Sequence, residues 1–113
     1  EQRRQLTRAV ARQAVAIARS VLKNAKLVIL DEPTAALGVA QTEQVLHLVR
    51  RLADSGVAVI IISHNLVDVF AVADYISVLY LGTMVAALET KDTNNEDIVG
   101  YITGIKTYEG AVE

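Results

Sequence analysis

The chain has 113 residues, 52% of them hydrophobic, and a formal net charge of −2 at pH 7. This length suffices for one domain with a core but not for two independent cores. The absence of cysteine excludes disulfides and thiolate metal sites. The longest apolar run, residues 57–62, is far shorter than the roughly 20 residues that span a bilayer, and the N-terminus lacks the apolar stretch of a signal peptide. We therefore expect one cytoplasmic domain over residues 1–113.

Basic residues are concentrated at the start of the chain. The first 26 residues hold seven of the eleven Lys and Arg and one acid, whereas the other residues hold twelve acids and four bases. Apolar residues at helical spacing predict a helix over residues 2–23, so that residues 1–26 form a basic N-terminal helix. This helix could be an interaction module for nucleic acid or anionic lipid; its basic side chains at the N-terminal end are Arg3, Arg4, Arg8 and Arg12. We favour a solvated helix face over nucleic-acid binding, because no aromatic side chains lie between the arginines.

The next segments alternate between apolar strands and amphipathic helices. The stretch "KLVIL" before Asp31 has the continuous hydrophobicity of a parallel strand that is covered on both faces. A helix is expected over about residues 40–54, ended by Gly56. A second strand over residues 57–63 and a short helix over residues 64–74 follow. This alternation predicts βαβ units and a mainly parallel sheet with flanking helices, in the α/β fold class.

The last third of the sequence predicts a hairpin and a helix. Strands are expected over residues 75–81 and 83–89, joined at Gly82 in a tight turn. A helix over residues 94–104 begins with two asparagines, either of which can cap its free amides, and two acids that suit its positive end. Residues 105–113 are interpreted as a loose tail.

Two adjacent carboxylates, Asp31 and Glu32, follow the first strand directly. A carboxylate at the carboxyl end of a parallel strand points into the crevice where α/β folds bind ligands. Beside a nucleotide, such a carboxylate can hold Mg²⁺ through water, and a second one can polarise the attacking water as a general base. The stretch "LVILDE" is therefore typical of a Walker B motif with a catalytic glutamate. The alternative is a strand end with two solvated acids.

Three motifs in one order carry a resemblance to a known family. They are contained in the stretches "AVAIARSVLKNAKLVILDEPTAALG" and "VAVIIISHNLVDVFAVADYISVLYLGTMVA". Over about residues 12–104, the chain resembles the nucleotide-binding domain of ABC transporters, in particular the ATP-binding proteins of bacterial sugar importers. The resemblance implies a P-loop NTPase-like partial core, in which residues 27–104 run from the Walker B strand through the C-terminal portion of an ABC ATPase domain.

The resemblance also implies roles for four residues. Asp31 would be the Walker B carboxylate, which holds Mg²⁺ through water and belongs to the nucleotide-binding site. Glu32 would be the catalytic base that orients water. His64 would be the switch histidine that contacts the γ-phosphate, and Ser63 next to it would belong to the nucleotide-binding site.

The resemblance also implies the family's cofactors, partners and function. Its cofactors are ATP and Mg²⁺, and its partners are a transmembrane permease subunit and a second nucleotide-binding domain. The implied function is ATP binding and hydrolysis that drive sugar import, at the inner face of the membrane. Residues 35–39 match the D-loop that lies between two such domains, although Gly38 stands where the family commonly carries aspartate.

Two parts of an ABC ATPase site are missing from the sequence. No G-x-x-x-x-G-K-[ST] motif is present, so the amides and the lysine that hold the phosphates are absent. The residues aligned with the family's Ser-Gly-Gly-Gln signature are Arg8, Ala9, Val10 and Ala11. Their side chains would block the close backbone approach that glycine permits.

We therefore expect a truncated or engineered C-terminal portion of an ABC ATPase that is inactive alone. The alternative is a non-catalytic α/β scaffold derived from that domain. Without the P-loop strand beside it, the strand over residues 27–31 would have an open apolar edge, which favours self-association.

Overall fold

The computed structural model describes Arg19 and residues 23–110. The predictions made for residues 1–18, 20–22 and 111–113 lie outside the described residues; they include most of the basic helix, its N-terminal arginines and the altered signature motif. The chain divides into two compact units, which are described separately below. Unit 1 ends at Asp68, and unit 2 begins at Val69.

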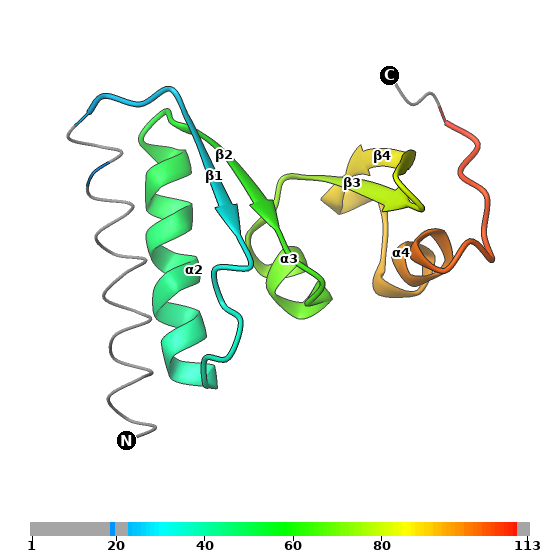
Figure 1. Ribbon diagram of the computed structural model, residues 1–113, viewed down its shortest axis with the longest axis horizontal. Helices are drawn as coiled ribbons and strands as arrows, with labels where there is room; N and C mark the ends of the chain where they lie inside the picture. The colour runs from blue at the N-terminus through cyan, green and yellow to red at the C-terminus, as the bar shows by residue number, and fades with distance from the viewer. Residues whose placement is uncertain (1–18, 20–22, 111–113) are drawn as a thin grey trace. The chain divides into compact units, whose positions relative to one another are not determined.

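Unit 1 contains a parallel strand pair and a long helix. β1 (Leu27–Asp31) and β2 (Ala58–Ile62) are paired in parallel. The register places Leu27 opposite Ala58 and Asp31 opposite Ile62. α2 (Val39–Asp54) connects the two strands and packs against β2, and Figure 1 shows it running alongside them. The predicted βαβ unit is therefore confirmed.

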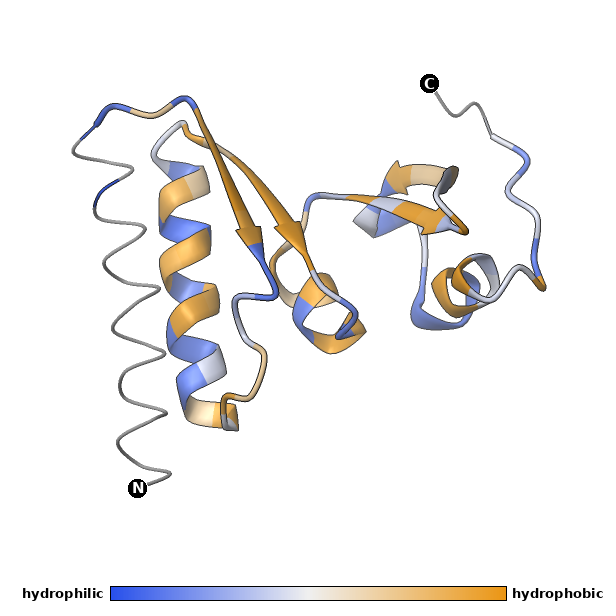
Figure 2. Cartoon of the chain, in the orientation of Figure 1, coloured by the Kyte–Doolittle hydropathy of each residue, from blue (hydrophilic) through white to orange (hydrophobic). Residues whose placement is uncertain are grey.

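Only one face of this strand pair is covered by described residues. Along β1, Val28 and Leu30 are buried, whereas Leu27 and Ile29 are 51% and 59% exposed. Figure 2 shows that both strands are hydrophobic along almost their whole length. The buried side chains of α2 are Val45, Val49 and Leu52. The prediction that the first strand is covered on both faces is thus not met by the described residues, because these supply one packing layer, α2.

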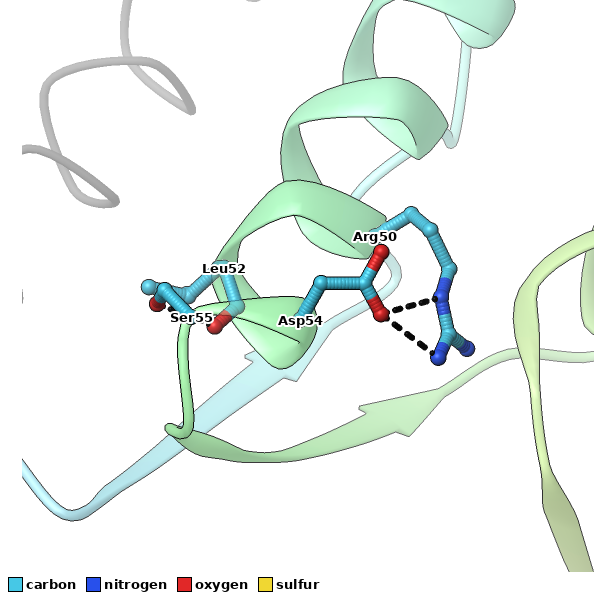
Figure 3. Close-up of polar contacts among 4 residues, drawn as sticks. All are labelled: Arg50, Leu52, Asp54 and Ser55. Carbon is cyan, nitrogen blue, oxygen red and sulfur yellow. Dashed lines mark hydrogen bonds and ion pairs between the residues drawn. The ribbon is translucent and has the colours of Figure 1, made fainter.

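The C-terminal end of α2 is held by polar contacts close in sequence. Ser55 Oγ donates a hydrogen bond to the Leu52 carbonyl at 2.6 Å, and Arg50 forms an ion pair with Asp54 at 2.9 Å, as Figure 3 shows. Gly56 follows with φ 102°, a left-handed conformation that glycine adopts without steric cost. The helix therefore ends where the sequence predicted.

The boundary between the units falls within α3 (Leu66–Val72), and unit 2 continues with an antiparallel hairpin. β3 (Tyr75–Tyr80) and β4 (Thr83–Glu89) are joined by Leu81 and Gly82, both with positive φ. Two consecutive residues with positive φ are typical of a tight hairpin turn. The predicted hairpin is confirmed.

A short 3₁₀ turn, η1 (Thr90–Asp92), leads to α4 (Asn95–Ile102), which packs against β3. The Asn94 side chain accepts a hydrogen bond from the Asp97 amide at 2.9 Å, so the first of the two asparagines is the helix cap. None of the described helices is long and apolar enough to cross a membrane.

The segment after α4 is attached to unit 2 by its side chains. The Tyr108 hydroxyl donates a hydrogen bond to the Ala87 carbonyl at 2.9 Å, and Lys106 Nζ lies 2.6 Å from Asp97 Oδ1. Residues 105–110, which were expected to form part of a loose tail, thus make two side-chain contacts, Tyr108 with β4 and Lys106 with α4. The α/β fold class, with a parallel sheet, helices and an additional hairpin, is confirmed.

Candidate functional site

The carboxylate pair lies at the carboxyl end of β1, as predicted. The Glu32 amide donates a hydrogen bond to the Ile62 carbonyl at 2.7 Å, which extends the pairing one residue beyond β1. Asp31 is exposed on the same face as Ile29. No other described residue donates a hydrogen bond to its carboxylate, so the Asp31 oxygens can bind water or a cation.

The chain turns sharply at Glu32. This residue has φ 49° and Ala36 has φ 63°, a conformation that costs a residue with a side chain roughly 1–2 kcal/mol. Two backbone hydrogen bonds close the turn, from the Ala35 amide to the Glu32 carbonyl and from the Leu37 amide to the Thr34 carbonyl, both at 3.2 Å. Such conformations are concentrated at functional sites, where the surrounding structure maintains them.

Glu32 and His64 are brought together by the register of the two strands. Because β1 and β2 end side by side, the residues that follow them are neighbours. His64 Nδ1 lies 2.7 Å from Glu32 Oε1. The His64 side chain is 86% exposed and that of Glu32 34% exposed. With Nδ1 engaged on the carboxylate, Nε2 is the ring nitrogen that remains for a ligand.

Ser63 is not joined to the carboxylates in this arrangement. Its hydroxyl accepts a hydrogen bond from the Asn65 amide at 3.0 Å, which forms a local turn before α3. The structure therefore brings together Asp31, Glu32 and His64 at the ends of β1 and β2, and it assigns the hydroxyl of Ser63 a contact within its own loop.

A buried hydrogen bond beside the site was not predicted from the sequence. Thr34 Oγ1 donates to Asp68 Oδ2 at 2.7 Å, and both residues are only 8% exposed. Asp68 lies in the first turn of α3, where its amide donates to Asn65 Oδ1 at 3.3 Å. The sequence contained one signal for this hydrogen bond, an acid, Asp68, within a largely apolar short helix. A buried acid needs a hydrogen-bond partner, so such a residue indicates one nearby.

The end of β1 offers one unengaged oxygen-donor group among the described residues, the Asp31 carboxylate. No three Asp, Glu or His side chains gather closely enough among the described residues to enclose a metal ion. The unengaged Asp31 carboxylate offers oxygen ligands of the type that Mg²⁺ prefers, and this ion keeps several of its waters when one or two carboxylates and phosphate oxygens hold it. The residues present therefore fit a hydrated Mg²⁺ beside a nucleotide.

Comparison with known sequences identifies relatives that are named as sugar import ATP-binding proteins. No protein-family model matches the chain. It is 43% identical over 95 residues to the fructose import ATP-binding protein FrcA of Rhizobium meliloti, covering 84% of this chain and 36% of that protein. It is 45% identical over 92 residues to the xylose/arabinose import ATP-binding protein XylG of Sulfolobus acidocaldarius, covering 81% and 37%. The chain thus spans little more than a third of the length of these curated relatives.

Comparison with solved structures identifies chains of ABC transporters. A chain of an ABC transporter described as of metal-chelate type, in an inward-facing conformation, matches 84% of this chain and 38% of its own length, with a TM-score of 0.72 and 27% identity. The ADP conformation of an ATP-binding cassette of an ABC transporter matches 80% and 34%, with a TM-score of 0.64 and 25% identity. The predicted resemblance is confirmed: over about four fifths of its length the chain is homologous to the ATP-binding proteins of sugar importers, and it corresponds to a C-terminal portion of an ABC ATPase domain.

Proposed function

We propose that the chain supplies the water-activating part of an ATP-hydrolysis site in the ATP-binding subunit of an ABC sugar importer. The observation that carries this proposal is the 2.7 Å contact between Glu32 Oε1 and His64 Nδ1 at the paired ends of β1 and β2. The relatives are named as import proteins for fructose and for xylose and arabinose, and these names support a sugar as the transported substrate. A permease and a second nucleotide-binding domain are the proposed partners.

The residues have separate roles in the proposed reaction. Glu32 orients the attacking water and takes its proton as the water oxygen bonds to the γ-phosphorus and the bond from that phosphorus to the ADP oxygen breaks. His64, held by Glu32 through Nδ1, presents Nε2 to the γ-phosphate. Asp31 would hold Mg²⁺ through water, and the ion supplies neutralisation of the phosphate charge when bound.

The chain alone lacks the means to hold the phosphates. No P-loop sequence occurs in its 113 residues, so the phosphate-binding amides and lysine have to come from sequence outside them. We therefore propose that the chain hydrolyses ATP only together with such a segment. An ATP titration of the chain alone should show no saturable binding, and tight binding would contradict this part of the proposal.

The test is a chimera in which residues 27–104 replace the matching part of the R. meliloti fructose import protein. ATP hydrolysis by the purified chimera is compared with that of its Glu32→Gln variant. Removal of a general base typically costs 10²–10⁴-fold in rate, and we expect a loss of at least about 10²-fold. Glu43→Gln, at an exposed glutamate of α2, is the matched control and should leave the rate unchanged. A chimera that hydrolyses ATP equally well with Glu32→Gln would refute the role of Glu32.

A further inference from the structure

We infer that Thr34 and Asp68 are positioning residues that hold Glu32 and His64 at hydrogen-bond distance. The inference rests on the proposed function, since it concerns the same two residues. Neither the Thr34 nor the Asp68 side chain forms a hydrogen bond with Glu32 or His64. Their hydrogen bond, Thr34 Oγ1 to Asp68 Oδ2 at 2.7 Å, joins segments 34 residues apart in the sequence.

Thr34 fixes the loop that carries Glu32. It is two residues beyond Glu32 in the turn closed by the Ala35–Glu32 and Leu37–Thr34 backbone hydrogen bonds. The two left-handed residues of this turn, Glu32 and Ala36, flank Thr34. Because such a conformation persists only where other contacts maintain it, a buried anchor between them determines the direction in which the Glu32 side chain leaves the strand.

Asp68 fixes the loop that carries His64. Its amide bonds to the side chain of Asn65, the residue directly after His64. The Asn65 amide in turn bonds to Ser63 Oγ, directly before His64. The loop around His64 is therefore connected to Asp68 by two short-range hydrogen bonds. The Asp68 carboxylate in turn accepts the hydrogen bond from Thr34, which lies in the loop of Glu32.

The exposed contact between Glu32 and His64 cannot set its own geometry. The imidazole is 86% exposed, and an exposed polar contact contributes little because water competes for both partners. Thr34 and Asp68 are both 8% exposed. Burial removes the water that would compete for the hydrogen bond between them, so this bond is stronger than one at the surface. The buried hydrogen bond between Thr34 and Asp68 therefore sets the distance between the Glu32 and His64 side chains.

The test uses nuclear magnetic resonance of the full chain, with ¹⁵N-labelled histidine and one buffer for all variants. Nitrogen shifts of the His64 ring report whether Nδ1 is engaged, and proton cross-peaks between the His64 ring and the Glu32 side chain report their distance. Glu32→Ala defines the spectrum of an unengaged ring. In Thr34→Val we expect the Nδ1 shift to move towards that of Glu32→Ala and the cross-peaks to be lost. Thr34→Ser, which keeps the hydroxyl, should restore both.

A destabilised control separates positioning from general loss of structure. Val49→Ala removes two methyl groups from a side chain that is 2% exposed and should leave the His64 shifts unchanged. Unchanged His64 shifts in Thr34→Val, or equal changes in Val49→Ala, would overturn the inference. This readout does not depend on hydrolysis. If the Glu32→Gln chimera retained full activity while Thr34→Val still displaced His64, the proposed function would fail and the positioning pair would stand.

Discussion

The uncovered face of β1 and β2 predicts weak self-association of the chain. We call this surface the open face of unit 1; it consists of Leu27, Ile29, Ile60 and Ile62, which are 51%, 59%, 48% and 50% exposed. Ile29 lies directly opposite Ile60 in the register, so the two side chains are neighbours. Replacing this central pair with Thr should reduce association and leave the strands intact, because threonine is β-branched and suits a strand.

The expected strength follows from the exposed fractions. Fully burying a Leu or Ile side chain contributes about 1.5–3 kcal/mol, so burying the exposed half contributes about 1 kcal/mol. Two copies that meet through the open face would then gain about 8 kcal/mol. Association costs at least about 4 kcal/mol in lost freedom. The remainder, about 4 kcal/mol, corresponds to a dissociation constant near 1 mM.

Sedimentation equilibrium up to roughly that concentration is the assay. We expect the unaltered chain to be partly dimeric at the upper end and the Ile29→Thr, Ile60→Thr double variant to be monomeric throughout. Val39→Thr, at an 80% exposed residue of α2, is the control and should associate like the unaltered chain. A strictly monomeric unaltered chain would refute the reasoning. Association in the micromolar range that survives the double substitution would instead indicate backbone pairing at the free edge of a strand.

Three further substitutions test the energetics of single contacts. Thr34→Val should lower the free energy of unfolding by about 2 kcal/mol in urea titrations, because it leaves the buried Asp68 carboxylate without its donor; a loss below about 0.5 kcal/mol would contradict this. Gly38→Asp should raise that free energy by about 0.5 kcal/mol, since α2 has no side-chain cap and no acid in its first turn; no gain at neutral pH would argue against it. The hydrogen bond from Lys106 to Asp97 raises the pKa of Lys106 above its ordinary 10.5, so the stabilisation is complete below pH 10.5 and is lost as the pH rises through the raised value. Asp97→Asn should therefore lower the pKa of Lys106 in a ¹³C-detected titration, and an unchanged pKa would show that the contact is absent in solution.

Local signals were sufficient to predict most of the secondary structure. The apolar spacing of residues 40–54 and the glycine after them predicted α2, which spans Val39–Asp54. The turn at Gly82 and the asparagine cap of α4 depend on neighbours within a few residues, so the sequence contains what determines them. The adjacency of Glu32 and His64 was also predictable, because each follows an apolar strand and parallel strands end at one edge of a sheet.

The features that were missed depend on contacts far apart in the sequence. Hydrophobicity along β1 predicted cover on both faces, but it cannot say which segment provides the second layer. In the short helix that was predicted over residues 64–74, the buried residues are Asp68 and Val72, which are 8% and 9% exposed. Burial of an acid at that position is favourable only because Thr34, from another loop, donates to it. No spacing rule within the helix contains that information.

The geometry explains why two carboxylates stand side by side after β1. Along a regular strand, neighbouring side chains point to opposite faces, and Asp31 accordingly remains on the exposed face, with its carboxylate available for water and Mg²⁺. Glu32 leaves the strand through its left-handed turn and reaches His64 beyond β2. One turn thus separates the carboxylate proposed to hold Mg²⁺, Asp31, from the one proposed to activate water, Glu32. Because Glu32, His64 and the Thr34–Asp68 hydrogen bond all lie within unit 1, a phosphate-binding segment from elsewhere would need only to deliver the nucleotide to a carboxylate already in place.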